Sequence, residues 1–208
     1  MSGFTIEGIF FLIVIIASAI LHEYMHGWAA NELGDPTAKY AGRLSLNPKV
    51  HIDPVGSIIL PALLLFSGTG LLFAYAKPVP YNPYNLKDQK KGPAIVAFAG
   101  PFANFMLALV FGLAMRAIVA YDLTQFAALF PFLAIIVQAN VMLFVFNLVP
   151  IPPLDGSKLL YAILPDSAYK FRVALERYGF MLLIAFILFF SHILWPIMAF
   201  FTKLFIGM

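Results

Sequence analysis

Long apolar runs separated by short polar segments dominate the chain. Three of these runs cover residues 4–30, 93–120 and 126–149. A helix rises about 1.5 Å per residue, so each run is long enough to cross a bilayer core of about 30 Å. The pattern predicts an all-α membrane protein built around these helices.

Two further apolar runs are interrupted. The run over 57–76 is broken near its middle by Ser67-Gly68-Thr69-Gly70, so it either spans the membrane or enters and turns back. The run over 178–207 is interrupted at Ser191-His192 and at Pro196, which predicts two helices or a hairpin. Together the runs predict a polytopic bundle of about four to six transmembrane helices.

The polar segments carry turn signals and proline breaks. Residues 40–46 fit a short strand or β-hairpin, while the prolines of 77–83 predict an extended segment. Pro150-Ile151-Pro152-Pro153 ends the run over 126–149, and a short helix is expected over 155–164. The hairpin at 40–46 and the extended segment are both candidate strand edges for holding a bound peptide.

Composition supports the membrane assignment. Hydrophobic residues make up 62% of the 208 residues, charged residues only 11%, and the mean hydropathy is +0.91. We expect one membrane-embedded domain over 1–208. The first run lacks the basic start of a signal peptide, so a retained helix is expected. Cysteine is absent, and no basic cluster alternates with aromatic residues, which gives nucleic-acid binding no support.

Charge asymmetry favours one topology. If 57–76 is re-entrant and the N-terminus lies outside, every basic residue from Lys39 to Arg177 except Arg116 lies on the inner side. If 57–76 is a true span, the basic residues divide between the two sides. Basic loops prefer the cytoplasmic side, so the first arrangement is the better one.

The segment His22-Glu23-Tyr24-Met25-His26 is the strongest chemical signal. On a helix, HExxH places two imidazoles one turn apart on one face, where both can bind one Zn²⁺. The Glu beside the first His can then take a proton from water at the metal. Ionisable groups in a membrane helix are costly and usually functional. The alternative is a set of interfacial residues that end the helix.

A catalytic zinc needs a third protein ligand and one open position. Asp155 is the best candidate because, in the favoured topology, it follows a helix that ends on the same side as His26. It could instead cap the short helix that follows it.

These segments together resemble the site-2 proteases. The resemblance rests on HExxH, on Gly100-Pro101-x-x-Asn104, and on the segment Asn147 to Asp155-Gly156, and it extends over roughly residues 10–160. The segment over 76–83 is similar to the compact prokaryotic branch, and a PDZ domain or a CBS pair does not fit this length.

The resemblance implies one Zn²⁺ per chain, bound by His22, His26 and Asp155, with Glu23 as general base and acid. It implies hydrolysis of a peptide bond within or near the transmembrane segment of a membrane protein. It also implies a multi-pass protein of a prokaryotic cell membrane, with the active site nearer the cytoplasmic side. The sequence sets neither the substrate nor the oligomeric state.

Three other polar residues have open roles. Asn147 is a candidate donor to an oxyanion, and Asn140 lies on nearly the same helical face. For both, the alternative is a hydrogen bond between membrane helices. His51 is expected in a solvated loop, with a metal role as the alternative. For the whole chain, the alternative function is a metal-binding membrane protein that binds transmembrane partners without cleaving them.

Overall fold

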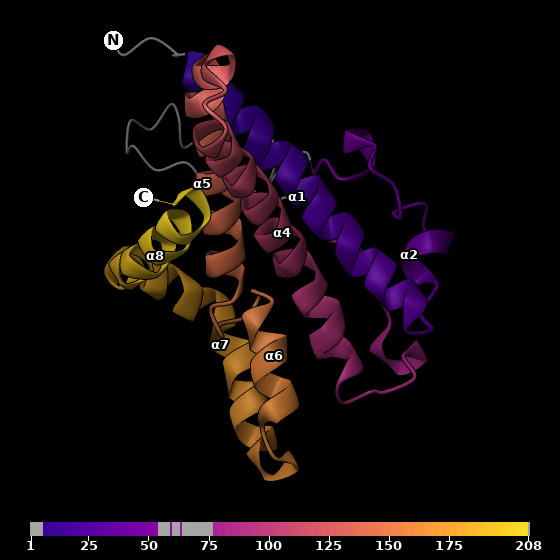
Figure 1. Ribbon diagram of the computed structural model, residues 1–208. Helices are drawn as coiled ribbons and strands as arrows, with labels where there is room; N and C mark the ends of the chain where they lie inside the picture. Colours follow the sequence, from indigo (N-terminus) through magenta and orange to yellow (C-terminus); the bar gives the residue numbers. More distant parts are fainter. Residues whose placement is uncertain (1–5, 54–58, 60–62, 64–76, 208) are drawn as a thin grey trace.

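Most of the described part of the chain is helical (Figure 1). The computed structural model describes residues 6–53, 59, 63 and 77–207, and it has no β-strand among them. The α-helices are α1 (Ile6–Glu32), α2 (Thr37–Tyr40), α4 (Gly92–Ala120), α5 (Phe130–Asn147), α6 (Gly156–Ile163), α7 (Tyr169–Phe189) and α8 (Leu194–Ile206). The 3-10 helices are η1 (Pro48–Val50), η3 (Pro83–Asn85), η4 (Thr124–Leu129), η5 (Asp166–Ala168) and η6 (Ser191–Ile193). The predicted helical class is confirmed.

Among the residues that the structure describes, three helical segments are long and apolar enough to cross a membrane: α1, α4, and η4 together with α5. Helices α7 and α8 would form a fourth span if the pair counts as one, although they are bent by 69°. The bend falls at the predicted Ser191-His192 interruption. Pro196 lies in the first turn of α8, where a proline is tolerated. The protein is therefore a multi-pass membrane protein. The run over 57–76 lies outside the described residues except at 59 and 63.

Helix α4 is the central element of the bundle. It contacts α1, α5 and α8, and α1 also contacts α5 (Figure 1). Phe105 and Ala108 of α4 pack with Phe144 of α5 and Phe205 of α8 in one apolar core. Lipid does not drive helices together hydrophobically, so this close packing is what holds them. It also places the polar half of α1 directly against α4.

The strand or hairpin expected over 40–46 does not form. Tyr40 ends α2, Gly42 turns the chain at a φ of 65°, and the Arg43 amide donates back to the Ala38 carbonyl. The Arg43 side chain then donates to the backbone carbonyls of Lys77 and Pro78. This long-range contact replaces strand pairing, and it joins the loop after α2 to the extended segment.

Asp35 makes a second set of long-range contacts at the same end of the bundle. It is fully buried just after α1. One carboxylate oxygen accepts hydrogen bonds from Thr37 and from the Asn85 side chain, and the other accepts from the Asn82 amide at 2.6 Å. Burial raises the pKa of Asp35, but the hydrogen bonds outweigh it and hold that pKa below its ordinary value.

Replacing Asp35 by Asn should lower the free energy of unfolding by about 1–3 kcal/mol, because an NH₂ group would then face the Asn82 amide. Thermal unfolding in detergent would measure this loss. Asp166→Asn is the control, because that carboxylate is 90% exposed and should matter little. Since the folded-state pKa of Asp35 is depressed, its stabilising effect is present at neutral pH and is lost as the pH falls through that value. A wild-type and Asp35→Asn difference that does not shrink on acidification would contradict this account.

Candidate metal centre

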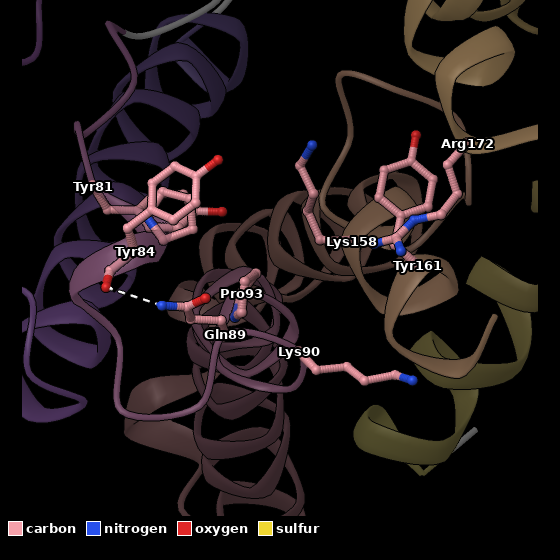
Figure 2. Close-up of a pocket in the computed structure, with 9 residues that line it drawn as sticks. Tyr81, Tyr84, Gln89, Lys90, Pro93, Lys158, Tyr161 and Arg172 are labelled. Carbon is pink, nitrogen blue, oxygen red and sulfur yellow. Dashed lines mark hydrogen bonds between the residues drawn. The ribbon is translucent and has the colours of Figure 1, made fainter. Parts of the chain in front are cut away.

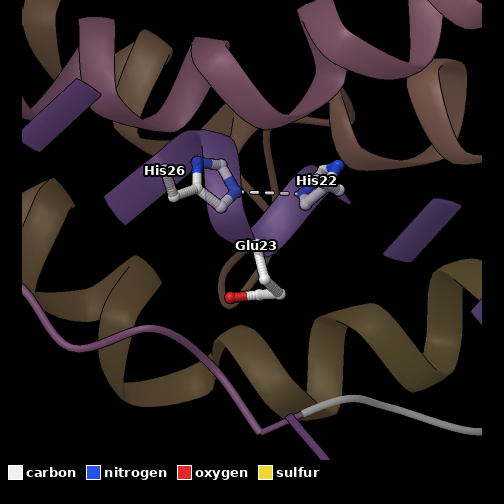
Figure 3. A group of neighbouring side chains, drawn as sticks. All are labelled: His22, Glu23 and His26. Atoms are coloured by element: carbon white, nitrogen blue, oxygen red, sulfur yellow. Dashed lines mark hydrogen bonds between the residues drawn. The ribbon is translucent and has the colours of Figure 1, made fainter. Parts of the chain in front are cut away.

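The two histidines of α1 meet on one face of the helix. The Nε2 atoms of His22 and His26 lie 3.0 Å apart, and both rings are largely buried (Figure 3). Glu23 projects from a neighbouring side of the same helix, and the ligand atoms of all three residues lie within 4.8 Å of one another. The four-residue spacing on a helix produces this grouping.

Asp155 joins the histidines from the other end of the chain. Its Oδ2 atom lies 3.1 Å from His22 Nε2 and 3.3 Å from His26 Nε2. Although Asp155 occupies the N-cap position of α6, its side chain makes no capping hydrogen bond. The carboxylate therefore faces the histidines rather than the helix that it precedes.

The outer nitrogen of each imidazole is held by an oxygen acceptor. His22 Nδ1 lies 2.6 Å from Asn104 Oδ1, and His26 Nδ1 lies 2.7 Å from the Val96 carbonyl oxygen. Asn104 Nδ2 donates to Asn140 Oδ1 at 3.0 Å, which fixes the Asn104 oxygen toward His22. Because these partners only accept, each Nδ1 carries the proton and each Nε2 directs a lone pair inward.

This donor set fits a zinc ion. Two lone pairs and a carboxylate oxygen converge at 3.0–3.3 Å, which is unfavourable unless a cation lies among them. Ligands about 2.0–2.1 Å from a tetrahedral zinc are separated by about 3.3 Å, so the three distances suit its coordination. The set leaves a fourth position for water or substrate.

The charge state of Asp155 agrees with a ligand role. Burial would raise the pKa of its carboxyl group, but in the protein without metal the imidazoles can bind a second proton at Nε2, and the resulting hydrogen bonds and charge outweigh burial and lower that pKa to about 2. Zinc would take the place of those protons. The carboxylate is therefore ionised at neutral pH and ready to bind a cation.

Gly100 of α4 brings the two long helices together at this point. A Cβ atom built on Gly100 would lie 2.5 Å from His26 Nε2 and 2.6 Å from His22 Nε2. No side chain fits there without displacing the imidazoles. Glycine at this position is what allows α4 to lie against the Nε2 atoms of His22 and His26.

Glu23 is oriented by the extended segment. Its Oε2 atom accepts a hydrogen bond from the Val79 amide at 2.8 Å. The Arg43 guanidinium holds the two residues before Val79 by their carbonyl groups. Arg43 thereby fixes the backbone that orients the Glu23 carboxylate.

The structure places the remaining polar residues as follows. Asn140 is fully buried and hydrogen-bonds Asn104, as expected for a bond between membrane helices. Asn147 donates to the Leu143 carbonyl of its own helix, and no hydrogen bond joins it to the three candidate ligands. The solvated position expected for His51 is wrong, because His51 is 1% exposed and pairs with the Ser45 carbonyl oxygen.

Sequence reasoning missed three contributors to this centre. Asn104 belongs to the Gly-Pro-x-x-Asn segment, but that segment alone does not show which side chain the amide meets. The Val96 carbonyl and the Val79 amide are backbone groups that any residue could supply, so no sequence signal marks them.

Replacing Asn104 by Leu should weaken zinc binding by about 10–100-fold, because His22 loses the acceptor that sets its tautomer and ring orientation. Competition with a zinc-chelating dye would measure the affinity. Asn147→Leu is the matched control, since it removes a side-chain amide that also lies on a membrane helix but donates within its own helix rather than to a histidine. Equal zinc affinity in the Asn104 variant and the wild type would contradict the predicted contribution of this bond.

Comparison with known proteins links this arrangement to a family. The model of peptidase family M50 matches residues 114–190, which include Asn147 and Asp155. The chain is similar to YwhC of Bacillus subtilis, a protein whose name describes it as a zinc metalloprotease. The two are 36% identical over 198 residues, or 91% of this chain and 85% of YwhC.

Two further relatives carry the same kind of name. Rip2 of Mycolicibacterium smegmatis is 31% identical over 85% of this chain and 66% of Rip2. MJ0611 of Methanocaldococcus jannaschii is 31% identical over 72% of this chain and 68% of MJ0611. No solved structure matches the chain significantly.

Proposed function

Because this chain belongs to peptidase family M50, the zinc metalloproteases that include the site-2 proteases, we propose that it cleaves a peptide bond within or near the transmembrane segment of membrane-protein substrates. The observation that supports this best is the convergence of His22 Nε2, His26 Nε2 and Asp155 Oδ2 beside Glu23. We assign these three residues as ligands of one zinc ion per chain, within a single membrane domain. The centre lies nearer the cytoplasmic side of a prokaryotic cell membrane.

The proposed hydrolysis needs a metal ion and a residue that transfers protons. The contribution of bound zinc is Lewis acidity, which polarises a carbonyl group and acidifies a water molecule. Glu23 accepts the proton of that water and returns it to the leaving amine. The Val79 amide occupies one Glu23 oxygen, which leaves the other as the proton acceptor.

Asn147 is our candidate for binding the oxyanion of the transition state. One hydrogen of its Nδ2 atom donates to the Leu143 carbonyl, which leaves the second hydrogen for the substrate oxygen. Catalytic hydrogen bonds often form only once substrate is bound.

The extended segment over 77–83 is poorly suited to pair with a substrate strand. Prolines 78, 80 and 83 have no amide hydrogen. The amides of Lys77, Val79 and Asn82 already donate to His51, Glu23 and Asp35. A β-ladder needs a regular row of free donors, so the role of this segment is to orient Glu23.

The zinc content of purified protein tests the proposal. Full-length protein in detergent should hold about one zinc per chain, and Asp155→Ala should lose most of it, because the metal then has only two imidazole ligands. Atomic absorption after metal-replete purification would measure both. A wild type without zinc would overturn the proposed function. Zinc retained equally by Asp155→Ala would overturn the assignment of Asp155.

A further inference from the structure

A cavity lies between the start of α4 and helices α6 and α7 (Figure 2). Its volume is about 310 Å³. Tyr81 and Tyr84 stand on one side, and Lys158, Tyr161 and Arg172 face them from the other. Nothing in the proposed hydrolysis uses this cavity.

The residues that line the cavity carry positive charge and no negative charge. Lys90, Lys158 and Arg172 line the cavity, and no acidic residue does. The two lysines pair with Asp166 and Glu176 outside the lining, in exposed contacts that hold them weakly. Arg172 pairs with no carboxylate of the described residues, and its guanidinium lies 5.1 Å from the Tyr161 ring centre. The cavity therefore presents cations to an incoming anion.

Tyr161 positions the two cations of the cavity. It is 7% exposed, and its ring centre lies 5.3 Å from Lys158 Nζ and 5.1 Å from the Arg172 guanidinium. Burial and the nearby Glu176 carboxylate raise the pKa of Tyr161 to about 12, so the phenol stays neutral. The ring therefore holds both cations at the cavity without adding negative charge.

The cavity lies where helices enter the membrane. The apolar span of α4 begins at Gly92, directly after Lys90 and Lys91. Helix α7 carries Lys170, Arg172 and Arg177 near its start, before its apolar part. Basic and tyrosine residues at the ends of membrane helices lie at the depth of lipid headgroups.

We propose that this cavity binds the phosphate headgroup of an anionic phospholipid, with Lys158 and Arg172, both held over the Tyr161 ring, as the cations. An acidic protein segment is a poorer occupant, because regions that flank membrane helices on the cytoplasmic side are enriched in Lys and Arg. The site is independent of proteolysis, so its test needs no cleavage assay.

Titration of the full-length protein in detergent, followed by microscale thermophoresis, tests the proposal. The probes are dihexanoyl phosphatidylglycerol, dihexanoyl phosphatidylcholine and inorganic phosphate. Arg172→Gln should weaken phosphatidylglycerol binding by about tenfold or more, and Lys158→Gln by about fivefold. Arg177→Gln is the matched control. It lies on the same helix and over a tyrosine ring, but outside the cavity, and it should stay within about twofold of the wild type.

Several outcomes would overturn the proposal. An equal loss in the Arg177 variant would indicate attraction to general surface charge. Inorganic phosphate that binds as tightly as phosphatidylglycerol would indicate a free-anion site, and preferential binding of a polyglutamate peptide would indicate a protein ligand. Melting temperatures without lipid identify misfolded variants, and Lys158→Gln, a change at a partly exposed side chain, is the second variant if Arg172→Gln fails to fold. Wild-type affinity in Lys158→Gln, together with wild-type affinity in a folded Arg172→Gln, would rule out this cavity.

Discussion

Replacing Glu23 by Gln is expected to lower the cleavage rate by about 10²–10⁴-fold, the usual contribution of a positioned general acid–base group. Gln keeps the size of the side chain and can still accept the Val79 hydrogen bond through its oxygen. It cannot take a proton from water at neutral pH. The rate would be measured in proteoliposomes with a membrane-spanning substrate that carries a fluorescent reporter.

Zinc content is the control for this variant. Glu23 is not among the three groups that converge as ligands, so the Gln variant should hold as much zinc as the wild type. Loss of both zinc and cleavage would show that Glu23 binds the metal. Binding of a transmembrane substrate without cleavage by the zinc-loaded wild type would instead favour the non-cleaving membrane protein.

The long helices could be predicted closely from the sequence. The apolar run over 93–120 corresponds to α4 (Gly92–Ala120), and the run over 4–30 corresponds to α1 (Ile6–Glu32). Within lipid, a chain segment has to satisfy its own backbone hydrogen bonds, so a long apolar run has few alternatives to a helix. The helix predicted over 155–164 is likewise present as α6 (Gly156–Ile163).

The polar segments were harder to predict because long-range contacts decide them. The strand expected at 40–46 was wrong since Arg43 binds carbonyl groups more than thirty residues away. His51 was expected in solvent, but it is buried. Its backbone carbonyl accepts a hydrogen bond from the amide of Lys77, the residue whose carbonyl Arg43 binds. Local residue patterns carry no information on such partners.

The candidate metal centre likewise has a part that could be predicted from local sequence and a part that depends on long-range contacts. The positions of His22 and His26 follow from their spacing on one helix. That Asp155 meets them depends on the packing of α1 against α4 and α5, which the sequence indicated only through motif resemblance and the favoured topology. The acceptors behind each imidazole, Asn104 and the Val96 carbonyl, required the structure.

Replacing Gly100 by Ala should weaken zinc binding by more than about 100-fold, which exceeds the usual effect of removing a partner behind one ligand. The added methyl group would occupy space 2.5–2.6 Å from the Nε2 atoms of His26 and His22, so it must push the imidazoles apart or separate α4 from α1. Alanine favours a helix over glycine by about 1 kcal/mol, so α4 itself should not be weakened. Zinc affinity measured by chelator competition would show the loss.

Gly112→Ala in the same helix is the matched control for Gly100→Ala. A Cβ atom there would lie 2.7 Å from the Phe205 Cβ atom, so this variant also crowds α4, but against α8 and away from the histidines. It should lower the melting temperature and keep zinc affinity within about threefold of the wild type. If Gly112→Ala lost as much zinc affinity as Gly100→Ala, zinc binding would depend on the packing of the whole bundle rather than on the contact at Gly100. Normal zinc affinity in Gly100→Ala would mean that α4 does not approach the histidines as closely as the structure places it.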